Sequence, residues 1–364
     1  MLAVVLGRID LVRALARAGV ASVVAGDPGD PIRHSRHVKA VIPADGLLDY
    51  ARAAGERPPL FYDSDSALEL LARERDELAA AFRFVLPPAD LLADLVDKAR
   101  FQALAERTRL PVPRAQRIAA GDAAGDAAPG LRFPVIVKAS PYRDRRWEEL
   151  AGDSKVLRVD DPRALAEALA RLDGAGVELM AQELVPGGEE RIESHHVYVD
   201  DGGAVAAEFT GRKIRTAPRE FGMTTSLETT DAPDVAAAGR VAVERLGFRG
   251  VAKLDFKRAP DGSLHLLEVN PRFTLWVHAG AVAGVNIPAV VHADLTGRPR
   301  PPAARARPGV RWIWPSADAA AARAAGIPLR RWLPWALRAE TNSSFAWSDP
   351  APYVRGRLAG LARR

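Results

Sequence analysis

The first part of the chain alternates short apolar runs with amphipathic segments, which is the pattern of a βαβ opening. The predicted elements are strands at 3–6, 20–25 and 60–63 and helices at 9–18 and 65–81. A single glycine, Gly7, follows the first strand, so the G-x-G-x-x-G signature of a dinucleotide site is missing. Two prolines end this unit, and residues 1–88 are expected to form a small open parallel-sheet domain.

The middle of the chain mixes strands and helices without an internal repeat. Helices are predicted at 89–107, 161–172, 233–246 and 276–296, and strands at 133–140, 178–185, 192–200 and 203–215. Asp161 followed by Pro162 is a typical helix start. Residues 89–298 are expected to form one domain with lobes at about 114–185 and 186–298, and the Arg-, Pro- and Trp-rich residues 299–364 an extension that packs back on it.

The most informative stretch is GVAKLDFKRAPDGSLHLLEVNPRF at 250–273, where two apolar-rich runs flank an Asp-Gly pair. This pattern predicts two antiparallel strands joined by a two-residue turn at Asp261 and Gly262. In that register Asp255 lies directly opposite Glu268. Two carboxylates ~4 Å apart at an effective dielectric of ~20 repel by about 4 kcal/mol, so the pair needs a reason to exist.

A divalent cation between the two carboxylates would turn their repulsion into attraction. Asp255 and Glu268, with Asn270 two residues further on, offer only oxygen ligands, which favour magnesium, with manganese as a stand-in. Arg272 could meet a phosphate or a carboxylate with its planar guanidinium. The alternative is an ordinary acidic hairpin edge, and the added N-P-R sequence favours the functional interpretation.

Composition excludes several chemistries. The 364 residues are 48% hydrophobic and contain no cysteine, which excludes disulfides, zinc-thiolate sites and thiol nucleophiles and fits a cytoplasmic location. There is no G-x-S-x-G sequence. No apolar run is long enough to span a membrane, no signal peptide is recognised, and no membrane partner is expected. The net charge of +5 comes mostly from scattered arginines, densest from Arg298 to Arg311, so nucleic-acid binding is not favoured.

Other polar residues are ambiguous one by one. Lys138 ends an apolar strand, where it would reach nucleotide phosphates or extend its ammonium into solvent. Lys213 and Arg215 are expected on one face of a strand, suited to a triphosphate or simply solvated. His195 and His196 are adjacent on a strand and point to opposite faces, so they cannot share a metal; His196 is the pocket candidate.

A second ambiguous stretch is Gln182-Glu183-Leu184-Val185, which ends a strand before Pro-Gly-Gly. A carboxylate and free backbone groups at such a place can bind the edge of an adenine. Glu189 and Glu190 follow the glycines, where they could accept hydrogen bonds from ribose hydroxyls. Taken alone, a charged loop is the simpler interpretation.

Six segments in order resemble the ATP-grasp superfamily, in its group of carboxylate–amine ligases similar to D-aspartate ligase. They are DKARFQALAERTRLPVP, FPVIVKAS, QELVPGGEE, FTGRKIRTAPREFG, GVAKLDFKRAPDG and LLEVNPRF. The resemblance covers about residues 1–298. It implies an α/β fold in which a Rossmann-like pre-ATP-grasp domain precedes a two-lobed ATP-grasp domain with antiparallel sheets.

The resemblance also implies a role for each matching residue. Lys98 and Lys138 would hold phosphates. Glu183, Leu184 and Val185 would hold adenine, and Glu190, with Glu189 as second choice, would hold ribose. Asp255, Glu268 and Asn270 would ligate magnesium. Arg272, Lys213 and Arg215 would face the transferred phosphoryl group, and His196, Thr274, Trp276 and His278 are the substrate-side candidates.

The reaction implied is ATP-dependent ligation of a small carboxylate to an amine, with amino acids among the candidates, through an acyl phosphate and with release of ADP. Two alternatives stay open: a biotin-carboxylase-like or carbamoyl-phosphate-type enzyme that uses bicarbonate, and a non-catalytic ATP-binding scaffold. A homodimer is compatible with the group. One departure concerns the Gly-rich flap of many relatives, because the segment after Lys138 is rich in arginine, and Arg143, Arg145 or Arg146 would cover the phosphates instead.

Overall fold

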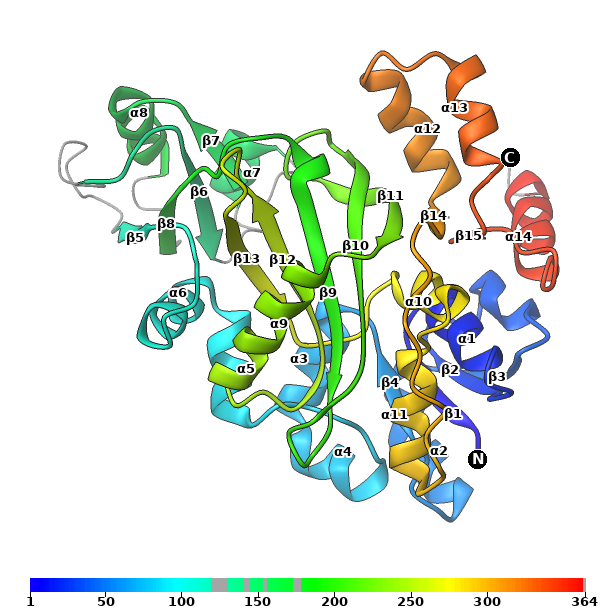
Figure 1. The fold of residues 1–364 in the computed structure, drawn as a ribbon. Coiled ribbons are helices and arrows are strands. Elements are labelled where there is room, and N and C mark those ends of the chain that lie inside the picture. Colours follow the sequence, from blue (N-terminus) through cyan, green and yellow to red (C-terminus); the bar gives the residue numbers. More distant parts are fainter. Residues whose placement is uncertain (119–129, 141–144, 153–155, 173–177, 363–364) are drawn as a thin grey trace.

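The N-terminal domain is an open parallel sheet, as predicted. A computed structural model describes residues 1–118, 130–140, 145–152, 156–172 and 178–362 (Figure 1). The first sheet has the order β3-β2-β1-β4. Its strands are β1 (Ala3–Leu6), β2 (Ser22–Ala25), β3 (Val38–Ile42) and β4 (Leu60–Tyr62), with helices α1 (Ile9–Ala16), α2 (Leu47–Ala54), α3 (Asp65–Arg73) and α4 (Arg75–Ala81). The single helix expected at 65–81 is two helices, because Glu74 leaves the helical conformation.

The next part of the chain forms a small lobe around an antiparallel sheet of order β5-β8-β6-β7. Its strands are β5 (Ala115–Ile118), β6 (Val135–Ser140), β7 (Val156–Val159) and β8 (Glu178–Glu183), and its helices are α5 (Ala89–Val96), α6 (Lys98–Arg107), α7 (Arg145–Ala151) and α8 (Pro162–Leu172). The helix expected at 89–107 is interrupted at Asp97, whose side chain instead accepts from Arg100 N–H and caps α6.

The largest sheet has the order β13-β12-β9-β10-β11-β14-β15. Its strands are β9 (Ile192–Val199), β10 (Val205–Ala217), β11 (Met223–Thr230), β12 (Gly250–Arg258), β13 (Leu264–Asn270), β14 (Arg311–Ile313) and β15 (Thr341–Asn342). The accompanying helices are α9 (Pro233–Arg245), α10 (Val277–Ala283), α11 (Ile287–Thr296), α12 (Pro315–Ala324), α13 (Leu329–Ala336) and α14 (Ala351–Ala362). β11 has no counterpart in the sequence-based prediction. The helix expected at 276–296 is split at Gly284, which has a φ of +109°.

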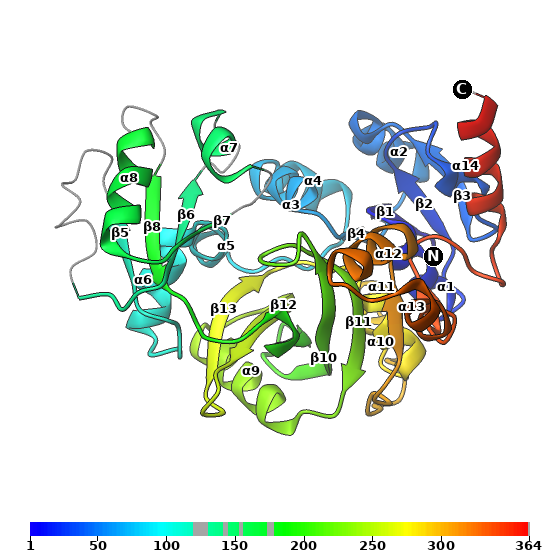
Figure 2. The same cartoon turned by 90° about the horizontal axis from the view of Figure 1, so that it is seen from above.

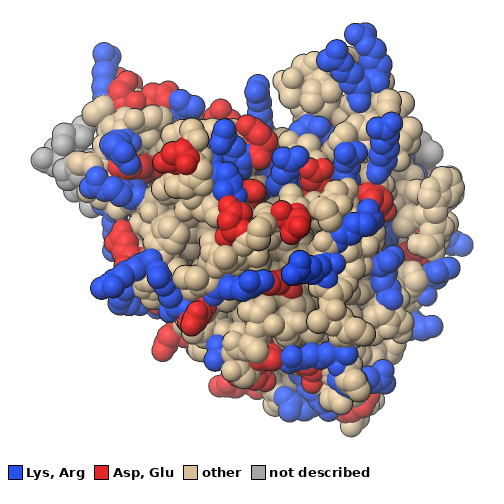
Figure 3. Space-filling model, viewed as in Figure 1, with Lys and Arg blue, Asp and Glu red and all other residues tan. Residues whose placement is uncertain are grey.

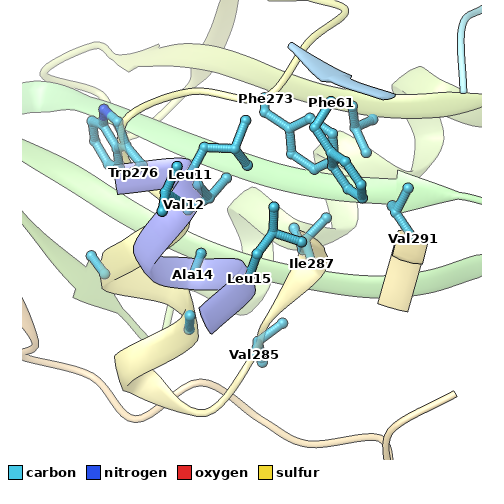
Figure 4. Close-up of a cluster of buried hydrophobic side chains, with 14 of the residues drawn as sticks. Leu11, Val12, Ala14, Leu15, Phe61, Phe273, Trp276, Val285, Ile287 and Val291 are labelled. Atoms are coloured by element: carbon cyan, nitrogen blue, oxygen red, sulfur yellow. The ribbon is translucent and has the colours of Figure 1, made fainter. Parts of the chain in front are cut away.

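The views in Figures 1 and 2 agree on the arrangement: the small lobe lies on one side, the N-terminal domain on the other, and the large sheet between them. The N-terminal domain is joined to the rest by a shared apolar core. Figure 4 shows Leu11 and Leu15 of α1 packed toward Ile287, with Phe61 and Phe273 beside them. No helix in the described part of the chain is long and apolar enough to cross a membrane.

The C-terminal extension is part of this core. β14 pairs with β11, so that Trp312 lies opposite Leu227, and both side chains are fully buried. The Trp312 indole Nε1–H donates to Oδ1 of Asp10 in α1 over 2.7 Å. Burial raises the pKa of Asp10 to about 6, against the lowering effects of this hydrogen bond and of Arg13. The extension is therefore tied to the N-terminal domain by a buried polar contact.

Asp10→Asn should stabilise the protein at neutral pH. The pKa of Asp10 is about 6 in the folded protein against an ordinary 3.8, so its proton contributes stability that is lost as pH rises through about 6. Asparagine keeps an acceptor for Trp312 without the charge. We expect the free energy of unfolding to rise by about 1–3 kcal/mol at about pH 7.5 and much less at about pH 4.5.

Chemical denaturation of both proteins at the two pH values measures this difference. Asp45→Asn, which changes an exposed carboxylate in the same domain, is the control. An Asp10→Asn protein that is less stable than the parent at neutral pH would show that the carboxylate charge stabilises the fold, contrary to this account.

Candidate active site

The hairpin of β12 and β13 places Asp255 opposite Glu268, as predicted, but its turn and the register next to the turn differ from the predicted ones. Ala259 N–H donates to Ser263 C=O, so Pro260, Asp261 and Gly262 form a three-residue turn, and the predicted two-residue turn is wrong. Pro260 has no N–H for a ladder hydrogen bond and fits the turn, while Gly262 adopts a φ of +89°. A register shift on the Asp255 side of Phe256 then restores the predicted pairing.

Asp255 lies at the centre of a buried polar cluster. Its side chain is 2% exposed; Oδ1 accepts from Ser194 Oγ over 2.5 Å and Oδ2 from Lys253 Nζ over 2.6 Å. Lys213 Nζ lies 3.8 Å from the same oxygen, Oδ2 of Asp255. Burial alone would raise the pKa of Asp255, but Lys253 and Lys213 hold it well below its ordinary range. The expected repulsion from Glu268 is therefore offset by two ammonium groups, which corrects the simple two-carboxylate picture.

Glu268 and Asn270 complete the face of the hairpin. Glu268 is exposed, and Asn270 Nδ2 donates to its Oε1 over 2.9 Å. The described residues contain no group of three or more His, Cys, Asp or Glu side chains that could hold a metal. The donor set is two carboxylates and one amide, all oxygen ligands, and it fits a magnesium ion that takes its other ligands from phosphates and water. Asp255, Glu268 and Asn270 would hold such an ion, and both oxygens of Asp255 already accept a hydrogen bond within the protein.

The two predicted phosphate lysines meet on the small lobe. Lys98 is the first residue of α6, and its Nζ donates to Ala139 C=O over 2.7 Å. Lys138 on β6 donates to Gln182 Oε1 over 2.8 Å, and both lysines line one small cavity. Burial lowers the pKa of Lys138 to about 8, and the charge of Glu268 acts in the opposite direction. Lys138 and the hairpin are thus electrostatically coupled across the two lobes.

The predicted adenine residues are largely occupied within the protein. The Glu183 carboxylate is 2.9 Å from Arg132 Nη2 and also accepts from the Arg132 backbone N–H. Leu184 N–H donates to Pro134 C=O, and the Val185 side chain is buried. The sequence around Arg132 carries no signal that would pair it with Glu183.

The two ribose candidates differ in their surroundings. Glu189 lies near Lys213 and Lys257, and burial raises its pKa against the effect of both lysines. Glu190 is exposed and folds over Gly188. The structure therefore leaves Glu190 the more accessible of the two, in the order that the resemblance implied.

Of the three basic residues expected at the phosphoryl group, Arg215 and Arg272 bind carboxylates on helices α12 and α3 instead. Lys213 faces Asp255, but the Arg215 guanidinium binds both carboxylate oxygens of Asp318 in α12, at 2.9 and 2.6 Å, and stacks 4.1 Å from the ring of Trp335. Arg272 Nε donates to Asp65 Oδ1 at the start of α3 over 2.7 Å. The hairpin is thus connected to the N-terminal domain, and β10 to the C-terminal extension.

The substrate-side candidates are mostly buried. The His196 ring is stacked on Phe209 with centroids 4.4 Å apart, and its Nε2 has no hydrogen-bond partner among the residues that the structure describes. Trp276 is fully buried beneath Lys253, whose Nζ is 5.1 Å from its ring centroid. Thr274 is also buried. His278 packs against α1 instead, with Nδ1 3.8 Å from an oxygen of Asp10. His196 and Thr274 nevertheless line one small cavity together with Arg272.

The arginine-rich segment is only partly described. Arg143 lies outside the described residues, whereas Arg145 begins α7 and pairs with Glu149 over 3.1 Å. Arg146 follows it on the same helix. Figure 3 shows the molecule hollowed between the small lobe and the α12–α13 hairpin, with side chains of both charges in the hollow.

Two residues that sequence reasoning missed are Lys253 and Ser194. Lys253 stands two positions before Asp255, so strand alternation alone would have put it on the same face. Ser194 comes from the neighbouring strand β9, which pairs with Asp255. No local signal identifies it, because the pairing of β9 with β12 joins residues about sixty positions apart.

Comparisons with known proteins give one family match and many similar solved structures. A family described as "ATP-grasp in the biosynthetic pathway with Ter operon" matches residues 192–315. The biotin carboxylase domain of Hydrogenobacter thermophilus 2-oxoglutarate carboxylase, in complex with MgADP and bicarbonate, has a TM-score of 0.62 at 17% identity, covering 85% of this chain and 72% of that one.

Two further solved structures are similar. N5-carboxyaminoimidazole ribonucleotide synthetase from Thermus thermophilus has a TM-score of 0.61 at 18% identity, covering 85% of this chain and 81% of that one. L-amino acid ligase from Bacillus licheniformis has a TM-score of 0.56 at 16% identity, covering 81% and 73%. A search of curated proteins found no match. An ATP-grasp family model thus matches residues 192–315, and the chain shares the overall fold of these solved structures.

Proposed function

We propose that this protein is an ATP-dependent ligase that joins a small-molecule carboxylate to an amine through an acyl phosphate, releasing ADP and phosphate. The observation that carries the proposal is the placement of the acidic hairpin against the basic small lobe. Asp255 and Glu268 are paired on the hairpin, and the charge of Glu268 acts on Lys138, which lies beside Lys98. A triphosphate between these elements would meet ammonium groups on one side and a cation site on the other.

Each group has a distinct task in this proposal. Lys98 and Lys138 hold phosphate oxygens, and Lys253 and Lys213 keep Asp255 ionised. Asp255, Glu268 and Asn270 would hold magnesium, which would neutralise charge at the phosphates when bound. Arg272 binds the substrate carboxylate. Without substrate, its guanidinium forms an ion pair with the carboxylate of Asp65 instead.

The chemistry then needs positioning more than a protein nucleophile. A carboxylate oxygen of the substrate attacks the γ-phosphorus, and the bond to the leaving ADP oxygen breaks. The nitrogen of the amine attacks the acyl carbon, phosphate leaves with the electron pair of the C–O bond, and the nitrogen loses a proton. The absence of cysteine and of a G-x-S-x-G sequence agrees with this mechanism.

Amino acids are the first substrates to test, because an L-amino acid ligase is among the similar structures. Bicarbonate is the second, since one similar structure holds bicarbonate with MgADP. The two alternatives share the ATP site and differ in the group that accepts the phosphoryl group.

The first prediction concerns ATP binding. Lys98→Ala and Lys138→Ala should each weaken the affinity for magnesium-ATP by roughly 1.5–3 kcal/mol, the scale of a hydrogen bond to a charged group. Isothermal calorimetry measures it, with Lys39→Ala, an exposed lysine on β3, as the control. Parent-like affinity in both variants would overturn the assignment of the phosphate site.

The second prediction concerns products. A panel of amino acids, hydroxy acids and bicarbonate should contain a carboxylate that triggers release of ADP together with phosphate. Hydroxylamine should trap the corresponding acyl hydroxamate. Formation of AMP and pyrophosphate would instead identify an adenylating enzyme, and ADP release with bicarbonate alone would select the carboxylase alternative.

The third prediction separates a working metal site from a decorated hairpin. Glu268→Gln should leave the melting temperature of the free protein nearly unchanged, because Glu268 is exposed and its repulsion from Asp255 is already offset. Most turnover should be lost, since a phosphate-bridging cation would lose a carboxylate ligand. Asp261→Asn, which alters a carboxylate in the turn of the same hairpin, should turn over normally. A Glu268→Gln protein with parent-like turnover would rule out the metal role.

A further inference from the structure

The C-terminal extension, residues 299–364, has an unusual surface. Of the twelve large apolar side chains exposed in the described residues, eight lie in it: Trp314, Leu329, Leu333, Leu337, Trp347, Tyr353, Val354 and Leu358. Large exposed apolar side chains that gather in one part of a soluble protein mark an interaction site. The concentration in this segment therefore needs a functional reason.

Helix α13 is apolar on two sides. Its inner side is anchored, because Trp332 Nε1–H donates to Asp318 and Trp335 stacks on Arg215. Its outer side carries Leu329, Leu333 and Leu337, which are spaced four residues apart and therefore form one stripe. These leucines are 67%, 45% and 77% exposed, so nothing in the described protein covers them.

The same segment is strongly basic. It contains twelve arginines, no lysine and three acidic residues, whereas the whole chain has a net charge of only +5. Arg330 is next to the leucine stripe on the helix surface, and Arg331 and Arg338 lie further round the helix. All three are exposed and form no ion pair within the described residues. Figure 3 shows Lys and Arg side chains gathered over this region with few acidic ones.

The three acidic residues do not offset this charge at the stripe. Asp318 is fully buried against Arg215, and Asp349 accepts from Ser35 Oγ. Glu340 pairs with Arg307 and accepts from the Arg311 backbone N–H. The exposed surface of α13 therefore presents a leucine stripe with Arg330 beside it and two further unpaired guanidinium groups, those of Arg331 and Arg338.

We propose that the outer face of α13 docks the protein on an anionic lipid surface. A helix that exposes an apolar stripe and arginines can lie in a membrane interface, with the apolar side chains among the acyl chains and the cations at anionic headgroups. The α12–α13 hairpin projects from the molecule (Figure 1), so it meets a flat layer more readily than a concave partner. Pairing with a second copy of the chain would bring like charges together.

This inference differs from the sequence-based expectation of no membrane partner, and it does not depend on the proposed ligase activity. A spanning helix is not involved, because the face is a short surface stripe. Binding is expected to be weak and reversible, since only three leucines and a few arginines contribute.

Co-sedimentation of the full chain with vesicles tests the proposal. The protein should bind vesicles of phosphatidylcholine with about 30 mol% phosphatidylserine, should not bind phosphatidylcholine alone, and should be released by salt. Leu329→Gln with Leu333→Gln, and separately Arg330→Gln with Arg331→Gln, should each weaken binding by about tenfold. Thermal melts check that these exposed changes leave the fold intact.

The matched control is Val96→Gln with Val241→Gln, which removes two exposed apolar side chains elsewhere and should bind like the parent. Three results would overturn the proposal. They are absence of binding to anionic vesicles, equal binding by the leucine variant, and loss of self-association in sedimentation velocity as the only effect of that variant. Binding to a DNA duplex without binding to vesicles would overturn it as well.

Discussion

The buried ionised carboxylate of Asp255 is the constraint around which the half of the molecule with the candidate site is arranged. A charge with 2% exposure is tolerated only with close partners, and here three strands supply them: Ser194 from β9, Lys213 from β10 and Lys253 from β12 itself. These contacts fix how the three strands lie relative to one another. They also leave Glu268 and Asn270 at the rim, where the hairpin faces Lys138 of the small lobe.

The fold was predictable where the signal is local. Apolar runs identified the parallel strands of the N-terminal domain, and the alternation around an Asp-Gly pair identified the hairpin. The prediction was wrong where a single residue ends one helix or begins another. Asp97 caps a new helix, Glu74 breaks another, and Gly284 ends a third, so three expected long helices are each two. β11 was missed, although it pairs with both β10 and β14.

The candidate site divides in the same way. The residues of the hairpin indicated Asp255 and Glu268, and the family resemblance indicated Lys98 and Lys138; the structure brings the two members of each pair together. Partners were not predictable, because they come from distant segments: Arg132 for Glu183 and Asp318 for Arg215. The sequence shows which chemical group a side chain carries, whereas tertiary packing decides which other group that side chain binds.

The register shift in the hairpin separates the geometry of the turn from that of the carboxylates. Between the turn and the register shift, β12 and β13 pair in the register that the three-residue loop sets. On the other side of the shift, Asp255 and Glu268 pair in the register that a two-residue loop would give. A strand of uniform pairing would transmit any change in loop length to every side chain and move one carboxylate to the other face. With a compensating irregularity close to the pair, the loop could vary in length and sequence while the acidic pair kept its position.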